Sequence, residues 1–154
     1  MIRLVPIPDQ DLKVWLTSMW ADYRKQLLGT GFTSEEASLN IELNEKALFV
    51  NGAPNDDQRI FDVMDDETKV GSLWLATREE RNAGEWYVYD IVIDEAFRGK
   101  GFGRSTMQAA EGYVKSQGGT RLALNVFGPN AVARGLYDSM DYKTMTIEMR
   151  KDLA

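Results

Sequence analysis

The segment from Ile91 to Arg104 places the strongest constraint on how this sequence can fold. An apolar run, Ile91-Val92-Ile93, leads within a few residues to three alternating glycines and then to a helix-forming stretch; the glycines are Gly99, Gly101 and Gly103. Glycine permits a positive φ and a close approach of the backbone to a ligand. Amides exposed at a helix start favour an anion. The segment therefore predicts a strand, an anion-binding turn and a helix in succession.

Two familiar phosphate-binding motifs do not match this turn. A P-loop requires Gly-Lys followed by Ser or Thr, whereas Lys100 is followed by Gly101. The Rossmann fingerprint requires a third glycine three positions after the second. That position holds Arg104 when the count starts from Gly99 and Gly101, and Thr106 when it starts from Gly101 and Gly103. The alternative to an anion site is a plain turn with solvated basic side chains. The grouping of Arg98, Lys100 and Arg104 in an acidic chain favours the anion site.

The spacing of apolar residues predicts the elements before this segment. Ile2–Pro6 is expected to form a strand. From Asp11 to Leu27, apolar residues recur every three or four positions, which is typical of a helix with one buried face. Thr33 followed by Glu36 is a capping-box pattern for a second helix that ends near Ala47. After a turn cluster at residues 51–57 the period becomes strand-like, and an antiparallel meander is expected; its strands are Arg59–Met64, Val70–Thr77 and Trp86–Ile93.

The last third predicts two helices and two strands. Residues Gly103–Ser116 show helical spacing, and Leu122–Val126 reads as a short buried strand. Asn130 is expected to cap a further helix, and alternation in Tyr142–Lys151 predicts a final strand. The predicted fold class is α+β with a mostly antiparallel twisted sheet, in the order β-α-α-β-β-β-α-β-α-β. We find no domain boundary, so residues 1–154 are expected to form a single domain.

Composition excludes several kinds of chemistry. The chain has 154 residues and contains no Cys and no His. A thiol nucleophile, a Ser-His-Asp triad and a Cys- or His-ligated metal are therefore excluded, and no metal is expected. With Lys+Arg 18 against Asp+Glu 24, the net charge is −6, which argues against nucleic-acid binding. No signal peptide or membrane-spanning run is evident, so we expect a cytoplasmic protein that does not bind membranes.

Two motifs together resemble the GCN5-related N-acetyltransferase (GNAT) family. Arg98–Gly103 is similar to the family's pyrophosphate motif, Arg/Gln-x-x-Gly-x-Gly/Ala. Leu124–Tyr137 is similar to its strand–Asn–helix segment that ends in Leu-Tyr. The predicted element order also looks like the GNAT fold, which implies a sheet that splays apart between the fourth and fifth strands.

The resemblance implies acetyl-CoA as cosubstrate and acetyl transfer to a primary amine by direct attack in a ternary complex. Amides of Phe102, Gly103 and their neighbours would hold the pyrophosphate, Ile91–Ile93 would pair with the pantetheine arm, and Asn130 would contact that arm. An amide near Ile93 would polarise the thioester. The implied cofactor-binding residues are Ile91, Val92, Ile93, Arg98, Gly99, Lys100, Gly101, Phe102, Gly103, Arg104 and Asn130.

The resemblance also implies catalytic roles. Tyr137 would protonate the departing thiolate, although from its place beside Leu136 alone it reads as a core residue. The general base must be a carboxylate or a water that it relays. Asp90 is the first candidate for the general base, and Glu85 and Glu95 are alternatives. An equally good interpretation is that Asp90 is a solvated carboxylate or the ion-pair partner of a nearby Arg.

The acceptor remains open at this stage. The first helices and the last strands would shape its cleft, with Trp20, Tyr23 and Phe32 as lining or core residues. The acidic balance suits a cationic amine, either a small molecule such as a polyamine or an aminoglycoside, or a lysine side chain of a peptide. A non-catalytic module that senses CoA or another nucleotide is the alternative function. The oligomeric state is open, with a homodimer as one option.

Overall fold

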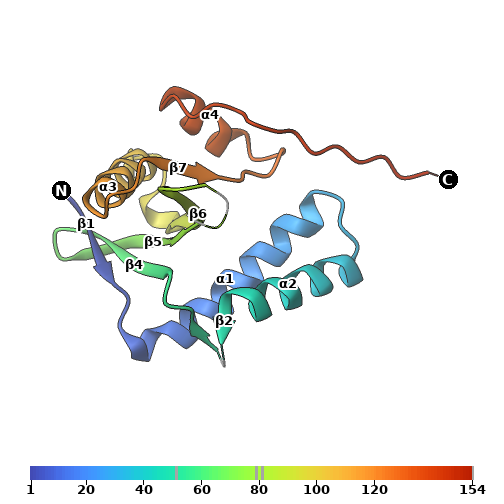
Figure 1. Ribbon diagram of the computed structural model, residues 1–154, viewed down its shortest axis with the longest axis horizontal. Coiled ribbons are helices and arrows are strands. Elements are labelled where there is room, and N and C mark those ends of the chain that lie inside the picture. Colours follow the sequence, from blue (N-terminus) through green and yellow to red (C-terminus); the bar gives the residue numbers. More distant parts are fainter. Residues whose placement is uncertain (51, 79, 81, 154) are drawn as a thin grey trace.

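The protein folds around a five-stranded sheet, as the computed structural model shows for residues 1–50, 52–78, 80 and 82–153 (Figure 1). The elements are β1 Ile2–Pro6, α1 Asp9–Gly29, α2 Ser34–Leu48, β2 Phe49–Val50, β3 Ala53–Pro54, β4 Gln58–Asp65, β5 Thr68–Thr77, β6 Glu85–Ile93, a 3₁₀ turn Glu95–Phe97, α3 Phe102–Ser116, β7 Arg121–Leu124 and α4 Ala131–Ser139. The predicted α+β class and the order up to the last helix are confirmed. The short β2–β3 hairpin within the predicted turn cluster was not foreseen, and position 51 of that cluster lies outside the described residues.

The sheet has the order β1-β4-β5-β6-β7. All neighbours are antiparallel except β6 and β7, which are parallel and joined by α3. A parallel pair needs such a crossover, because its second strand must start at the same end of the sheet as its first. The parallel pair therefore places the start of α3 beside the end of β6, where the glycine-rich turn lies.

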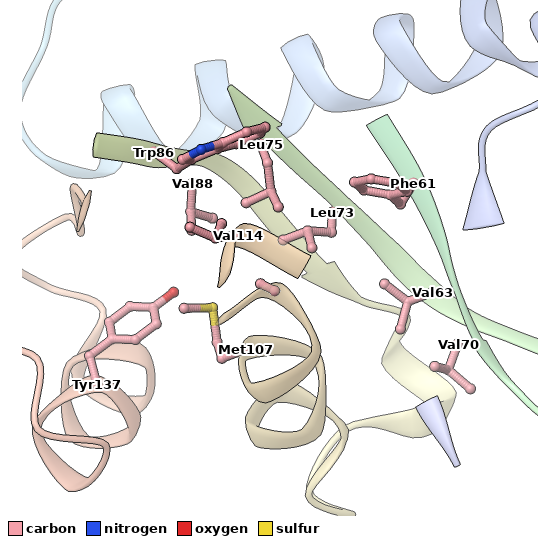
Figure 2. Packing of buried hydrophobic residues seen from close by; sticks show 11 residues of the cluster. Phe61, Val63, Val70, Leu73, Leu75, Trp86, Val88, Met107, Val114 and Tyr137 are labelled. Atoms are coloured by element: carbon pink, nitrogen blue, oxygen red, sulfur yellow. The ribbon is translucent and has the colours of Figure 1, made fainter. Parts of the chain in front are cut away.

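Two apolar clusters pack on opposite sides of the sheet. The first joins the sheet to α3 and α4 and includes Leu73, Met107 and Tyr137 (Figure 2). The second joins it to α1 and includes Trp15 and Trp74, whose rings meet edge to face at 5.8 Å. Alternate side chains of a strand point to opposite faces, so β5 supplies both clusters. The sheet thus forms the middle layer between α1 on one side and α3 with α4 on the other.

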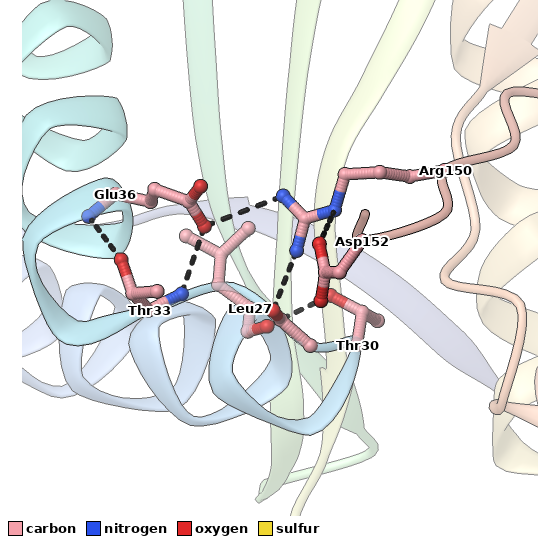
Figure 3. A network of polar contacts seen from close by, with 7 residues as sticks. Leu27, Thr30, Thr33, Glu36, Arg150 and Asp152 are labelled. Carbon is pink, nitrogen blue, oxygen red and sulfur yellow. Dashed lines mark hydrogen bonds and ion pairs between the residues drawn. The ribbon is translucent and has the colours of Figure 1, made fainter. Parts of the chain in front are cut away.

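The turn between α1 and α2 is stabilised by the predicted capping box. The Glu36 amide donates to Thr33 Oγ1 at 3.2 Å, and the Thr33 amide donates to Glu36 Oε2 at 2.8 Å (Figure 3). This pair satisfies amides that have no partner within the helix. The prediction of a helix start at this position is confirmed.

The predicted final strand at Tyr142–Lys151 is wrong for the single chain. Residues 142–153 form neither helix nor strand, and they leave the body of the molecule in an extended course (Figure 1). The alternation of apolar side chains is present, but a strand also requires a neighbouring strand for its hydrogen bonds, and the described part of the chain supplies none. The preceding strand, β7, is also shorter than predicted and ends at Leu124 rather than Val126.

Candidate active site

The sheet opens at the carboxyl end of β6. The parallel pairing of β6 with β7 runs from Glu85 opposite Arg121 to Val88 opposite Leu124 and then ends. β6 continues to Ile93 and stays paired with β5 only, in the part of the chain that the structure describes. A bulge at Tyr89, where the register with β5 shifts, marks the same point. The backbone edge of Ile91–Ile93 is thus available to an extended ligand, and the predicted splay between these two strands is confirmed.

The glycine-rich turn delivers unpaired amides to this opening. Gly99 has a φ of 73° and Gly101 a φ of 85°, conformations that residues with a side chain rarely adopt. Gly101 is the N-cap of α3 and offers no side-chain acceptor to the helix. The first amides of a helix have no intrahelical partner, so those of Phe102, Gly103 and Arg104 are the natural donors to an anion.

The three predicted cations surround this turn and also brace it. Arg98 Nε donates to the Ile93 carbonyl at 2.8 Å, and Lys100 Nζ donates to the Ala96 carbonyl at 3.0 Å. Arg104 Nη2 donates to Ser139 Oγ on α4 at 2.6 Å. All three residues are exposed. Their positive charge therefore lies around the α3 amides, while their hydrogen bonds fix the path of the turn between β6 and α4.

Helix α4 packs directly against the start of α3. A Cβ added to Gly103 would lie 3.4 Å from Leu136 Cδ2, in van der Waals contact, which shows how close the two helices come. Asn130 caps α4, because its side-chain oxygen accepts from the Ala133 amide at 3.1 Å. The predicted cap is confirmed. The proposed contact of Asn130 with a CoA arm is a separate role, and its exposed position leaves the side-chain amide at the surface.

Tyr137 lies on α4 with its ring buried at 8% exposure. It belongs to the first apolar cluster and meets Tyr142 edge to face at 5.8 Å, as the core interpretation predicts. Its hydroxyl points toward the sheet, beside Met107 (Figure 2). Burial, and then the charge of Asp90, raise the pKa of the Tyr137 phenol above its ordinary value. The raised pKa favours the protonated phenol, and the electrostatic effect of Asp90 indicates that the two groups lie near each other.

Asp90 lies on β6 within the opening of the sheet. Burial, and then the charge of the nearby Asp22 carboxylate, raise its pKa from 3.8 to about 7, against a hydrogen bond from the Ile91 amide that lowers it. A carboxylate with a pKa near 7 can accept a proton at neutral pH. Of the three carboxylates considered from the sequence, only Asp90 has this environment: Glu85 is bound to Asn82 and Arg121 at the other end of β6, and Glu95 is exposed.

A cleft of about 490 Å³ joins Asp90 to helix α1. Its lining residues are Asp11, Val14, Trp15, Ser18, Met19, Asp22, Lys69, Gly71, Ser72, Asp90, Val92 and Asp94. Lys69 forms a 2.6 Å ion pair with Asp62, so its charge is already matched. The remaining charged side chains of the lining are carboxylates, which give the cleft an acidic character.

The first helices were expected to shape the acceptor cleft, but the carboxylate of Asp22 on α1 was not foreseen. Asp22 follows Trp15 and Met19 on the same helical face, so a carboxylate interrupts an otherwise apolar stripe. This carboxylate within an apolar stripe is the sequence signal that could have identified Asp22 as a cleft residue. The aromatic residues predicted as lining or core, Trp20, Tyr23 and Phe32, are not among the lining residues. Trp20 packs against the second apolar cluster, and Tyr23 donates to Asn40 Oδ1 at 2.9 Å.

The described residues contain no cluster of His, Cys, Asp or Glu arranged to hold a metal ion. Among the same residues, no helix has the length and apolar character needed to cross a membrane.

Comparison with known proteins defines the class to which this fold and site belong. The model of the acetyltransferase (GNAT) family matches residues 15–142. The chain belongs to this family. The opening between β6 and β7 and the start of α3 lie within the matched range.

Two relatives from Bacillus subtilis (strain 168) match most of the chain. The uncharacterized N-acetyltransferase YdgE is 31% identical over 134 residues, which cover 86% of this chain and 85% of YdgE. The uncharacterized N-acetyltransferase YycN is 26% identical over 154 residues, covering 99% of each. The crystal structure of YycN superposes with a TM-score of 0.91 over 100% of this chain and 99% of that one. The protein AAC(6')-Iy shares the fold, with a TM-score of 0.59 at 16% identity and 99% coverage of both chains.

Proposed function

We propose that this protein transfers the acetyl group of acetyl-CoA to a primary amine by direct attack in a ternary complex. The observation that carries the proposal is the position of Asp90 and Tyr137. Asp90 lies on β6 just beyond the last residue that pairs with β7, and its charge raises the pKa of the Tyr137 phenol. The family supports acetyl transfer in general. The two residues supply the proton acceptor and the proton donor that such a reaction needs.

The cofactor would bind through the backbone. Its diphosphate would accept hydrogen bonds from the amides of Phe102, Gly103 and Arg104, with the surrounding cations adding long-range attraction. Its pantetheine arm would continue the sheet beside Ile91–Ile93, the part of β6 that β7 leaves open. Peptide-like groups of the arm would then pair with the strand edge, as an added strand does. The thioester would reach the level of Asp90.

The acceptor would approach from the α1 side. Asp90 lines the 490 Å³ cleft, and its unprotonated form would take a proton from the attacking ammonium group. The free amine would then form a bond to the thioester carbon. The carboxylates of Asp11, Asp22 and Asp94 favour an amine with a further positive charge elsewhere in the molecule. AAC(6')-Iy was solved in complex with the bisubstrate analog CoA-S-monomethyl-acetylneamine; because that likeness shows the fold alone, it leaves the acceptor of this chain open.

The leaving group would be protonated from the other side. As the C–S bond breaks, the CoA sulfur takes up the electron pair, and the Tyr137 phenol would donate its proton to the thiolate. A phenol has an ordinary pKa of about 10 and a thiol of about 8.5, so the transfer requires direct contact. The proton taken by Asp90 and that given by Tyr137 balance through solvent after each turnover. No covalent enzyme intermediate is needed.

The test is a panel of amines incubated with acetyl-CoA, with release of free thiol as the readout. The absence of cysteine in the chain removes background from the protein itself. Thiol release that depends on an amine, together with an acetylated product of matching mass, is expected. A panel that stays silent while CoA binds tightly would contradict the proposal and support the alternative, a non-catalytic CoA-sensing module.

A further inference from the structure

Arg78, directly after β5, carries a positive charge that no described residue matches. Its Cζ lies 3.4 Å from the centroid of the Tyr87 ring and 5.7 Å from that of Tyr89. Every other arginine that the structure describes donates a side-chain hydrogen bond or forms an ion pair. Among the described residues, the guanidinium of Arg78 does neither, although the residue is half-buried. Arg78 is thus set apart from the arginines that brace the fold.

The contact with Tyr87 leaves the binding edge of Arg78 open. A guanidinium that stacks on an aromatic ring uses its face, while its N–H groups lie in its own plane and form a fork that matches a carboxylate. None of its nitrogens is among the fully buried, unpaired atoms of the described residues, so a ligand can reach them. Water screens a half-buried charge less than an exposed one. Arg78 therefore has the properties of a carboxylate-binding residue.

The aromatic surface beneath Arg78 is continuous with the acidic cleft. The Tyr89 ring stacks on that of Trp74 at 4.7 Å, and Trp74 meets Trp15, which lines the cleft. In the sheet, Trp74 is directly opposite Asp90. These contacts all lie on the face of the sheet that α1 covers. Arg78 and Asp90 are therefore parts of one surface.

Helix α1 borders the same surface from the other side. Tyr23 follows Asp22 in the chain, and its ring lies 5.9 Å from that of Phe127, between β7 and α4. Burial, and then the nearby Tyr87, raise the pKa of the Tyr23 phenol, which indicates that these two tyrosines lie near each other. The surface thus has the carboxylates of the cleft toward one end and the guanidinium of Arg78 toward the other.

We propose that Arg78 binds a carboxylate of the acceptor, and that the acceptor is a zwitterion whose primary ammonium group lies at Asp90. This inference rests on the proposed acetyl transfer. Tyr87, beneath Arg78, and Asp90 are three residues apart on β6, or about 10 Å at about 3.3 Å per residue. The α-ammonium and α-carboxylate groups of one amino acid are too close to span this distance. The amino group of an extended peptide and a carboxylate on its third residue lie at about this separation.

The two charged ends would also fix the direction in which the acceptor binds. In the reverse orientation its carboxylate would lie beside Asp22 and Asp90, and its ammonium group beside Arg78. Such like-charge contacts are strongly unfavourable. The contact with Arg78 would therefore turn the amine toward the thioester. Arg78 would determine specificity without touching the reacting atoms.

Calorimetry of peptide binding to the CoA-saturated protein tests the inference without turnover. The probes are Ala-Ala-Glu and Ala-Ala-Gln, both amidated at the carboxyl end, which differ in a single carboxylate. The wild type is expected to bind the Glu peptide about 10-fold more tightly, as one charge-assisted hydrogen bond allows. Arg78→Gln is expected to bind both peptides with the affinity of the Gln peptide. Arg78→Lys, which keeps the charge but loses the fork, should retain part of the preference.

Two further variants separate a specific contact from a general change of charge. Arg78→Glu is expected to prefer the amidated peptide Ala-Ala-Lys, because the charge of the site is reversed. Arg3→Gln is the matched control, since Arg3 lies on β1 and is bound to the Asp66 carbonyl and to Glu67. It removes the same charge at the far edge of the sheet and should keep the wild-type preference. Circular dichroism checks that each variant is folded.

Several results would overturn the inference. Equal affinity of the wild type for the Glu and Gln peptides excludes a carboxylate contact, as does the absence of heat with either peptide. A preference for the Glu peptide that persists in Arg78→Gln places the contact at another residue. Thiol release from many amines without this preference would reject the role of Arg78 and leave the proposed acetyl transfer standing. The preference without any acetylated product would support the role of Arg78 in binding and reject the acetyl transfer.

Discussion

The two faces of the opening at β6 are built by different means. On the proposed cofactor side, the features are backbone features: a strand edge without a described neighbour, two glycines at positive φ and the first amides of α3. On the proposed acceptor side, the features are side chains, chiefly the interacting carboxylates of Asp22 and Asp90, which line one cleft. A family that keeps one cosubstrate and varies its acceptors would need this division. The backbone side fixes what is shared, and the side-chain side is free to change.

The largest expected effect is on the acceptor side and concerns stability. Asp90→Asn is expected to raise the free energy of unfolding at pH 8 by up to about 4 kcal/mol, since each pKa unit corresponds to 1.36 kcal/mol. The native pKa of Asp90, about 7, lies above its ordinary value of 3.8, so its stabilising contribution is complete below pH 4 and is lost as the pH rises through 7. Denaturant unfolding of both proteins at pH 4 and pH 8 measures this.

The same variant should lose the acid limb of the pH–rate profile. In the wild type, kcat/KM is expected to rise with pH up to about 7 as Asp90 loses its proton. A variant whose extra stability is the same at pH 4 and at pH 8 would show that Asp90 is ionised normally in the folded protein.

The next largest effect is expected at the boundary between the two sides. Tyr137→Phe should lower kcat by about 100-fold or more, the size of a general acid's contribution, which is about 2.7 kcal/mol. The affinity for acetyl-CoA should be nearly unchanged, because the phenol makes none of the contacts proposed between the α3 amides and the diphosphate. Stopped-flow or steady-state kinetics with calorimetry of binding separates the two quantities.

Tyr142→Phe is the matched control for this variant. Its hydroxyl is bound to Glu111, and its ring packs against Tyr137. We expect it to lower stability by about 1 kcal/mol, the value of a typical hydrogen bond, and to leave kcat within a few fold. Equal losses of kcat in the two variants would contradict the assignment of the Tyr137 hydroxyl as the general acid.

A smaller effect is expected on the cofactor side. Gly101→Val should weaken acetyl-CoA binding about 5- to 30-fold, because a side chain at a φ of 85° costs about 1–2 kcal/mol and shifts the α3 amides. Gly112→Ala in the middle of α3 is the control, since it meets no atom within 4 Å and should keep the affinity. Isothermal titration calorimetry gives both constants, and unchanged affinity for Gly101→Val would remove the turn from the site.

The smallest effect is expected from the partner of Asp90 on α1. Asp22→Asn removes a negative charge near Asp90 and should move the acid limb of the pH–rate profile to lower pH by less than about one unit. The maximal rate should change little. A limb that moves to higher pH would contradict the assigned interaction between the two carboxylates.

The cofactor side was the predictable one. The spacing of Gly99, Gly101 and Gly103 after an apolar run is a local pattern, and local backbone geometry follows from local sequence. The capping box at Thr33 and the cap at Asn130 were predictable for the same reason. The meeting of Asp22 with Asp90 was not predictable, because the two residues are 68 positions apart and come together only through the packing of α1 on the sheet.

The C-terminal segment teaches the complementary lesson. Alternation at Met145, Ile147 and Met149 predicts a strand, yet these side chains are exposed in the single chain. Periodicity reports which side chains can share a face, but a strand also needs a neighbour to accept its backbone hydrogen bonds. The pattern alone does not say whether that neighbour belongs to the same chain.

The central claim is that the α3 amides and the open edge of β6 together bind coenzyme A. Titration of the ¹⁵N-labelled protein with CoA, followed through its backbone amide resonances, tests this most directly. The largest shifts are expected at Phe102–Arg104 and at Ile91–Ile93. Shifts confined to α1 and the acidic cleft, or no shift at saturating CoA, would contradict the account.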